Sequence, residues 1–149
     1  MSLSTTEYLD ILKEQVNNGQ TASMIISGGS MSPFLEHGRD VIYFEKPDKP
    51  LKKGDIIFFQ RDSGQYVVHR LIKKDDKGYY FIGDNQTETE GPIAKEKIFA
   101  IVTGAKRKGR NIGSKSFWWF FFAHIWINMI PLRRFLINSY KRIHGMLKN

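Results

Sequence analysis

Cysteine is absent from this 149-residue sequence, and histidine is scarce, with only His37, His69, His124 and His144. The lack of cysteine excludes disulfide bonds, zinc–thiolate and iron–sulfur sites, and a cysteine nucleophile. No two histidines lie four residues apart, the spacing that places two metal ligands on one helix face. The sequence therefore predicts neither a bound metal nor another cofactor.

Acidic residues are missing from the last third of the chain. All 15 Asp and Glu lie between Glu7 and Glu96, and residues 1–105 also hold 13 Lys and Arg, so this part is nearly neutral. Residues 106–149 contain ten Lys and Arg and no acid. A neutral body with a basic tail is typical of proteins that contact a polyanion, either nucleic acid or an anionic membrane.

The first 20 residues predict an amphipathic helix that packs on the domain. Ser4-Thr5-Thr6-Glu7 has the form of a capping box, apolar residues follow at helical spacing, and Asn17-Asn18-Gly19 ends the pattern. A secretory leader would show a basic stretch, an apolar run and small residues at a cleavage site. The N-terminus has none of these, so we expect no Sec export through a cleaved leader.

Residues 21–105 change to the pattern of β-strands. Apolar or β-branched runs are separated by turn sequences such as Lys53-Gly54-Asp55 and Gly91-Pro92. The six runs cover residues 24–26, 41–44, 56–59, 66–72, 79–82 and 98–102. Because no helical stretch interrupts them, we predict a mainly β fold, a small antiparallel barrel or folded sheet, in a chain long enough for one domain.

Residues 106–149 form a basic, aromatic-rich tail. Within it, residues 117–132 hold all three Trp and no formal charge, and Arg133-Arg134 follow. This apolar stretch is shorter than the roughly 20 residues of a membrane-spanning helix. Trp flanked by Lys and Arg favours an anchor at the membrane interface over a single span, and makes nucleic acid the less favoured partner. We therefore expect a membrane-associated protein that binds through residues 117–137; a helix buried in the domain is the alternative.

Three short motifs carry the candidate chemistry. Ser30 follows Gly28-Gly29 on a predicted tight turn. His69 lies within the predicted strand 66–72, and a histidine is the usual group that takes a proton from a serine at neutral pH. Asp84, in a Gly-Asp-Asn turn, could orient such a histidine. Taken singly, each motif also fits an ordinary loop, a half-buried strand histidine or a turn.

Together these motifs resemble the type I signal peptidases, in particular the endoplasmic-reticulum and archaeal branch with a Ser-His pair. The resemblance covers residues 24 to about 102 and rests on Ser30-Met31-Ser32-Pro33, Lys52–Ile57, Val67-Val68-His69-Arg70 and Gly83-Asp84-Asn85. It implies a β-rich peptidase fold that cleaves a peptide or protein substrate without a cofactor. It also implies roles for Ser30 as nucleophile, His69 as general base and Asp84 as its partner. Gly29, Met31 and Pro33 would lie beside the substrate, and the Ser30 N–H would face the oxyanion.

Two alternatives remain open at the level of the sequence. A self-cleaving regulator of the SOS-repressor type, from the same clan, would need a lysine base and a scissile Ala-Gly or Cys-Gly pair. No such pair occurs, although Lys73 shares the predicted strand face of His69. The other alternative is a non-catalytic module whose basic tail binds membrane or nucleic acid. The sequence indicates no oligomeric state, and it has Gly28 where signal peptidases commonly carry a small hydroxyl residue.

Overall fold

The computed structural model describes residues 5–113 and 115–148, and its first element is helix α1, Thr5–Asn17. The helical spacing of the apolar residues buries Leu9, Leu12 and Val16 against the sheet. The helix ends where predicted, because Gly19 adopts a positive φ and donates its N–H to the carbonyl of Val16. The capping contribution of Ser4 lies outside the described residues.

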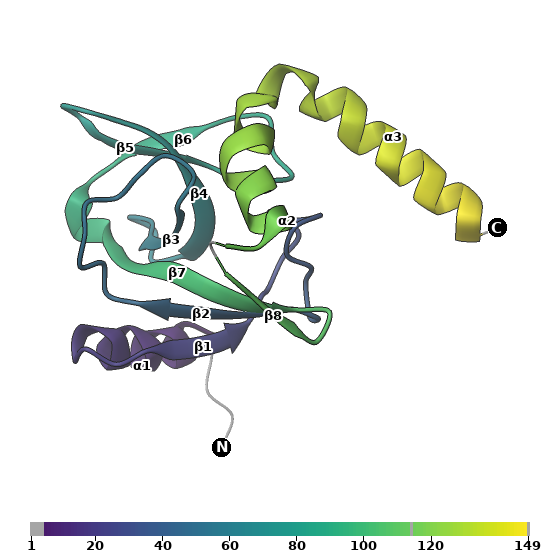
Figure 1. Cartoon of the computed structure of the whole chain (residues 1–149). Helices are drawn as coiled ribbons and strands as arrows, with labels where there is room; N and C mark the ends of the chain where they lie inside the picture. Colours follow the sequence, from purple (N-terminus) through teal and green to yellow (C-terminus); the bar gives the residue numbers. More distant parts are fainter. Residues whose placement is uncertain (1–4, 114, 149) are drawn as a thin grey trace.

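Eight strands form one antiparallel sheet (Figure 1). They are β1 Ala22–Ile25, β2 Val41–Glu45, β3 Ile56–Gln60, β4 Tyr66–Asp75, β5 Gly78–Ile82, β6 Glu90–Ile93, β7 Ile98–Arg107 and β8 Arg110–Gly113. Their order is β1-β2-β7-β3-β4-β5-β6, with β8 paired to β7. This confirms the mainly β, folded-sheet prediction. The sheet does not close into a barrel, because β1 and β6 lie at its two ends.

The sequence did not predict β6 and β8. β6 contains Gly91-Pro92, read as a turn; Pro92 is tolerated because β6 is an edge strand. β8 lies at the start of the segment interpreted from the sequence as a basic tail. The chain reverses there through Lys108 and Gly109, both with positive φ, and this two-residue turn pairs Arg107 with Arg110.

Buried side chains form two clusters in the folded sheet. The larger joins α1 to β2 and β7 and extends to the aromatic residues of the C-terminal segment. The smaller lies between β3, β4 and β5 and consists of Ile57, Phe59, Val67, Leu71, Tyr79 and Phe81. His69 packs beside this smaller cluster, with its ring centroid 6.2 Å from that of Phe59.

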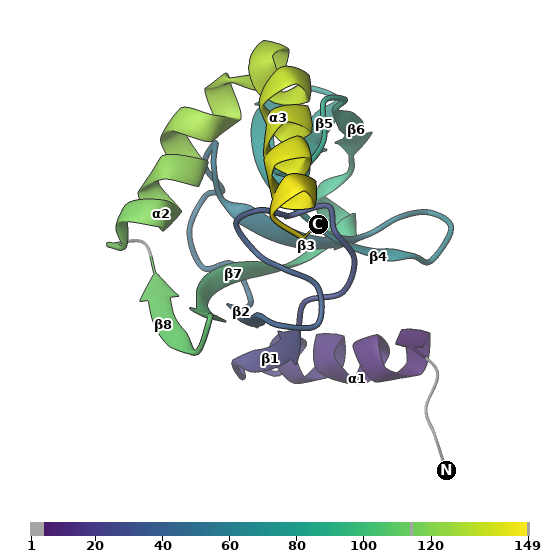
Figure 2. The same cartoon turned by 90° about the vertical axis from the view of Figure 1, so that its right-hand side faces the viewer.

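The aromatic stretch of the tail is partly core. It forms three short helical segments, α2 Phe117–Phe120, η2 Phe121–Ile125 and η3 Trp126–Asn128, followed by helix α3 Ile130–Lys148. Trp119, Phe122 and Trp126 are buried in the larger cluster. In Figures 1 and 2, α2 leans against the sheet, whereas α3 turns back and leads to the C-terminus. The predicted tail therefore contributes to the same core as residues 21–105.

Among the described residues, none of the helices is by itself long and apolar enough to cross a membrane. Residues 117–128 and 130–143 meet the length and composition criteria only as a pair, bent by 119°.

Candidate active site

A cleft of about 520 Å³ brings Ser30 and His69 to one site. Its walls come from α1, from β1 and the loop after it, from β3 and β4, and from Gln86 in the loop after β5. The cleft is lined by Thr6, Leu9, Met24, Ile26, Ser27, Gly28, Gly29, Ser30, Phe58, Arg61, Gln65, Tyr66, Val67, Val68, His69 and Gln86. No hydrogen bond joins Ser30 to His69 within the described residues, and catalytic contacts of this kind often tighten only around a substrate.

Ser30 is half-buried in a loop that is fixed on both sides. Before it, Gly28 has a φ of 85° and donates its N–H to Nδ1 of His37 at 2.8 Å. After it, Phe34 is fully buried, and Arg107 donates to the Phe34 carbonyl at 2.7 Å. No hydrogen bond of the described residues uses the Ser30 N–H, the group expected to face an oxyanion. The loop therefore holds the serine at the cleft with little freedom.

The Gly-Asp-Asn motif reaches Ser30 through its backbone. The Asn85 N–H donates to the Ser30 carbonyl at 2.8 Å. A Cβ at position 83 would lie 2.5 Å from the same carbonyl oxygen. Real Cβ atoms essentially never lie this close to a backbone oxygen. Glycine is therefore required at Gly83 because two backbone segments approach each other there.

His69 is buried and held in the neutral form. It lies on β4 opposite Ile57 of β3, and only 3% of its surface is exposed. Burial lowers the pKa of His69 to about 4; the carboxylate of Glu90 opposes this shift, and the cation of Arg61 adds to it. Its buried Nδ1 atom has no hydrogen-bond partner among the described residues. A neutral imidazole has one ring nitrogen without a proton, and this nitrogen can accept a proton from a serine.

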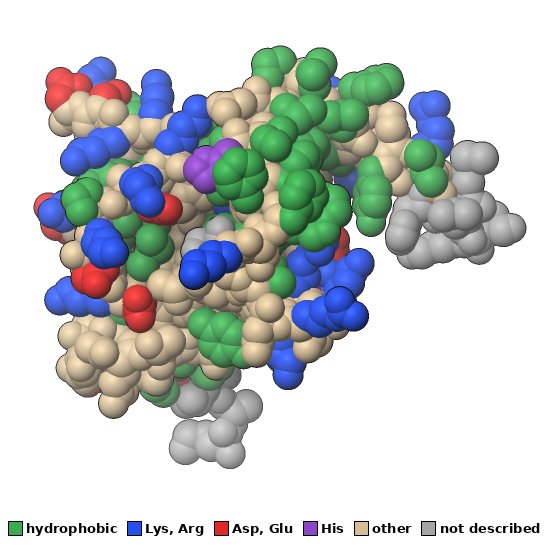
Figure 3. All heavy atoms as spheres, in the orientation of Figure 1, with side chains coloured by type: hydrophobic (Ala, Val, Ile, Leu, Met, Phe, Trp, Pro, Cys, Tyr) green, Lys and Arg blue, Asp and Glu red, His purple; other side chains and the backbone are tan. Residues whose placement is uncertain are grey.

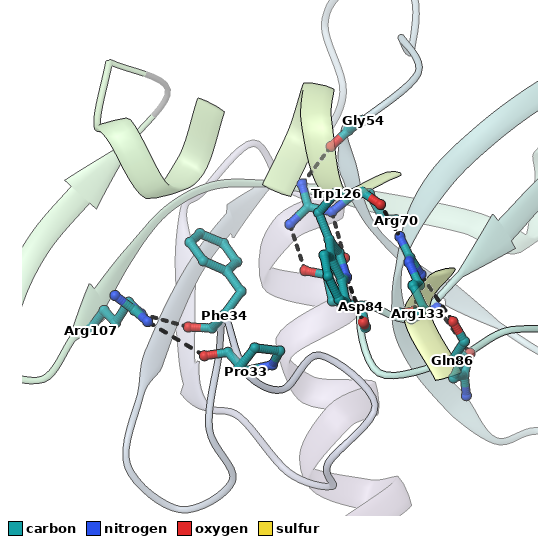
Figure 4. A network of polar contacts seen from close by, with 10 residues as sticks. Pro33, Phe34, Gly54, Arg70, Asp84, Gln86, Arg107, Trp126 and Arg133 are labelled. Atoms are coloured by element: carbon teal, nitrogen blue, oxygen red, sulfur yellow. Dashed lines mark hydrogen bonds and ion pairs between the residues drawn. The ribbon is translucent and has the colours of Figure 1, made fainter. Parts of the chain in front are cut away.

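Asp84 is paired with Arg70 and not with His69, which corrects the predicted role. Its two carboxylate oxygens accept from Nε and Nη2 of Arg70, each at 2.9 Å, and both side chains are fully buried (Figure 4). Arg70 also donates to the Gly54 carbonyl at 2.7 Å. The physical reason is strand alternation: adjacent residues of β4 point to opposite faces, so the motif places His69 and Arg70 on different sides.

The other residues considered for the site differ in whether they line the cleft. Gly29 lines the cleft. Met31 does not, because its side chain is 1% exposed and packs in the larger core cluster. Pro33 is also absent from the cleft; its carbonyl accepts from Arg107, and its ring lines a separate apolar groove beside Trp118. Lys73 is exposed over the ring of Tyr80 and does not line the cleft, because a register shift after Leu71 breaks the expected alternation.

Sequence reasoning missed four side chains around the site. Arg61 forms a bidentate ion pair with Glu90 at 2.7 Å, close enough to influence His69. Trp126 and Arg133, from the C-terminal segment, donate to carbonyls of the loop after β5. No sequence motif pointed to these four. By contrast, Arg70 stood next to His69 in the quoted motif and could have been considered as a partner for Asp84.

Comparison with known proteins gives the family. Residues 2–104, more than half of the chain, match the model described as Peptidase S24-like. The chain belongs to the Peptidase S24-like family. This S24-like peptidase is also 33% identical over 92 residues to a protein named signal peptidase I W of Bacillus subtilis. That alignment covers 58% of this chain and 48% of the relative, so the chain matches about half the length of that protein. No solved structure matches it significantly.

The matches support the resemblance to signal peptidases and leave its branch open. Neither match assigns the chain to the endoplasmic-reticulum and archaeal branch. The choice of His69 over Lys73 as base therefore rests on the cleft itself.

Proposed function

We propose that this chain is a serine endopeptidase that cleaves exported or precursor peptides, with Ser30 as nucleophile and His69 as general base. One observation carries the proposal: a serine on a fixed loop and a histidine held neutral line the same cleft. The family match and the signal peptidase relative support the same class of reaction.

The proposed reaction has two steps that share the same groups. His69 takes the hydroxyl proton as Ser30 Oγ attacks the peptide carbonyl, and the Ser30 N–H stabilises the oxyanion. The C–N bond then breaks, and the imidazolium gives its proton to the leaving amine. Water attacks the resulting acyl ester, His69 takes the water proton, and the acid leaves as the proton returns to Ser30 Oγ.

Asp84 has a supporting role in this mechanism. Its carboxylate is bound by Arg70, and Nδ1 of His69 has no hydrogen-bond partner among the described residues, so we assign Asp84 no direct contact with the base. We propose that the Arg70–Asp84 pair fixes the loop whose Asn85 N–H binds the Ser30 carbonyl. The orientation of His69 is then set by its packing between β3 and the rings around it.

The proposal is tested by covalent labelling with a fluorophosphonate probe and by digestion of a peptide library read by mass spectrometry. Ser30→Ala and His69→Gln should both abolish labelling and cleavage to a similar degree, because members of a nucleophile–base pair are not additive. Ser63→Ala, an exposed turn residue outside the cleft, is the matched control and should label normally. Wild-type labelling that survives Ser30→Ala would refute the assignment.

We further propose that the protein attaches to an anionic membrane surface through residues 117–137. The outward side chains of this segment are large and apolar, with Phe117 67%, Phe120 51% and Phe135 73% exposed. In Figure 3, hydrophobic side chains gather along α2 and the beginning of α3, with Lys and Arg side chains nearby. Arg134 is exposed on the same helix turn. Aromatic side chains beside cations suit the headgroup region of anionic lipids.

Flotation with vesicles tests this attachment. The full chain should float with vesicles that contain anionic lipid and float less with neutral vesicles. A Phe117→Ser/Phe120→Ser variant should float less with no change in melting temperature, since both side chains are exposed. Tyr8→Ser, at an exposed apolar position of α1, is the control and should float as the wild type does. Equal flotation of both variants, or binding of single-stranded nucleic acid in place of lipid, would refute attachment through this face.

A further inference from the structure

We infer that Trp126 and Arg133, on the C-terminal segment, are positioning residues that hold the nucleophile loop through the Gly83–Gln86 loop. This inference rests on the proposed peptidase function and adds two residues to its machinery. Neither side chain lines the cleft. Both would act on Ser30 only through the loop that lies between them and the serine.

The first step is a set of hydrogen bonds from the C-terminal segment to one side of that loop. Nη1 of Arg133 donates to the carbonyls of Gly83 and Gln86, both at 3.0 Å. The indole Nε1 of Trp126 donates to the carbonyl of Asp84 at 2.7 Å. Figure 4 shows these contacts beside the Arg70–Asp84 ion pair. Three of the four loop carbonyls are therefore bound by two side chains from beyond β8.

The second step is the contact of the same loop with the serine. The Asn85 N–H donates to the Ser30 carbonyl at 2.8 Å, and Gly83 lies against that carbonyl. Gln86 lines the cleft, and its side-chain oxygen accepts from the Gly83 N–H at 2.9 Å. A shift of this short loop would therefore move the backbone of Ser30. Small displacements at a nucleophile reduce the rate of reaction strongly.

The third step is the environment of Arg133. Its side chain is fully buried, and desolvation lowers its pKa to about 10. It also donates to the Trp126 carbonyl at 3.1 Å and lies over the Trp126 ring, 5.2 Å from the centroid. An apolar side chain could fill this space without burying a charge. A planar guanidinium instead offers several N–H donors at fixed angles. It can therefore bind carbonyl groups of two segments and keep those segments in one relative position.

The test compares Arg133→Met and Trp126→Phe with the control Arg110→Met. Arg133→Met removes the donors and retains an unbranched apolar chain, and Trp126→Phe removes one N–H and retains an aromatic ring. Arg110 is exposed in the β7–β8 hairpin. We expect the rate of fluorophosphonate labelling to fall about tenfold in Arg133→Met and several-fold in Trp126→Phe, and to stay unchanged in Arg110→Met. On a cleaved peptide, kcat should fall while KM stays constant.

Two readouts separate positioning from a general loss of stability. Guanidinium ion at low, non-denaturing concentration should restore part of the labelling of an Arg133→Ala variant, whereas urea of similar shape and no charge should not. Hydrogen exchange at the Asn85 amide, measured by NMR, should be faster in Arg133→Met and in Trp126→Phe than in the wild type. Exchange at the amides of β3 should stay unchanged. This exchange is independent of activity, so it tests the inference even if the wild type is not a peptidase.

The outcomes are separable. If Ser30→Ala labels like the wild type, the proposed function fails, and Asn85 exchange alone decides the inference. If the wild type is active and folded Trp126→Phe labels and exchanges at wild-type rates, the inference is wrong and the proposed function stands. If Arg133→Met does not fold, Trp126→Phe and the guanidinium rescue of Arg133→Ala decide. Lack of rescue together with unchanged exchange in Trp126→Phe would overturn the inference.

Discussion

The neutral state of buried His69 predicts a specific loss of stability in mild acid. In the unfolded chain a histidine binds its proton near pH 6.5, whereas burial lowers the pKa of His69 in the folded protein to about 4. Between these values the unfolded state binds more protons. The contribution of His69 to stability is therefore complete above about pH 6.5, falls as the pH decreases toward 4, and changes no further below that. A difference of about 2.5 pKa units corresponds to about 3 kcal/mol.

Urea unfolding of the wild type and of His69→Gln at pH 7.5 and pH 4.5 measures this contribution. Glutamine approximates the size of histidine and does not titrate, so the carboxylates that also titrate in this range affect both proteins alike. We expect the wild type to lose about 2 to 3 kcal/mol more than His69→Gln between the two pH values. Equal losses would mean that His69 is not buried in its neutral form, and would refute the reasoning about its pKa.

The same pKa predicts the pH dependence of the reaction. The rate of probe labelling should be nearly constant from pH 8 to about pH 5.5 and decrease at lower pH, with an apparent pKa near 4. An apparent pKa near 6.5 would show that the base of the free enzyme is solvated, contrary to its burial beside β3.

The remaining predictions concern the residues around the pair. Asp84→Asn should destabilise the fold by roughly 3–5 kcal/mol in urea unfolding, because it leaves Arg70 buried without its counter-charge; an unchanged midpoint would contradict this. Gly83→Ala should lower labelling about tenfold, since the added Cβ would press on the Ser30 carbonyl and displace the loop; wild-type labelling would show that the loop can adjust. Lys73→Ala should leave labelling unchanged, and a large loss would restore lysine as the candidate base.

The strands with clear patterns could be predicted from the sequence. All six apolar runs fall on strands, apart from Ile26 just after β1, because alternation and turn residues reflect local physics that the sheet preserves. β6 and β8 depend instead on partners far along the chain. β6 pairs with β5 despite its proline, and β8 pairs with the end of β7 that extends past β3. Such pairing leaves little local signal.

The sequence motifs predicted that Ser30 and His69 lie together, and both line one cleft. Their catalytic roles stay predictions. The pairing of Asp84 with Arg70 was missed because a carboxylate near a histidine suggests a triad, although strand alternation already placed His69 and Arg70 on opposite faces. The bulge after Leu71 could not be predicted, and it is this register shift that separates Lys73 from the cleft.

The sequence left the C-terminal segment as an anchor or as core, and the structure places part of it in the core. Trp119, Phe122 and Trp126 are buried in the main cluster, whereas other aromatic residues of the same segment are exposed. Composition gives little sign of this division, because only two polar side chains, His124 and Asn128, mark the outer face of an otherwise apolar stretch. Removing residues 116–149 would therefore remove core as well as the proposed lipid face, so single exposed positions are the appropriate targets.

The same division explains why a basic residue can be buried beside an exposed apolar surface. Arg133 follows the apolar stretch, where the sequence suggests a cation at the lipid headgroups. Helix α3 instead turns it inward to the Gly83–Gln86 loop, while the adjacent Leu132 and Phe135 remain exposed. Residues one and two positions apart on a helix point in different directions, so one turn contacts both environments.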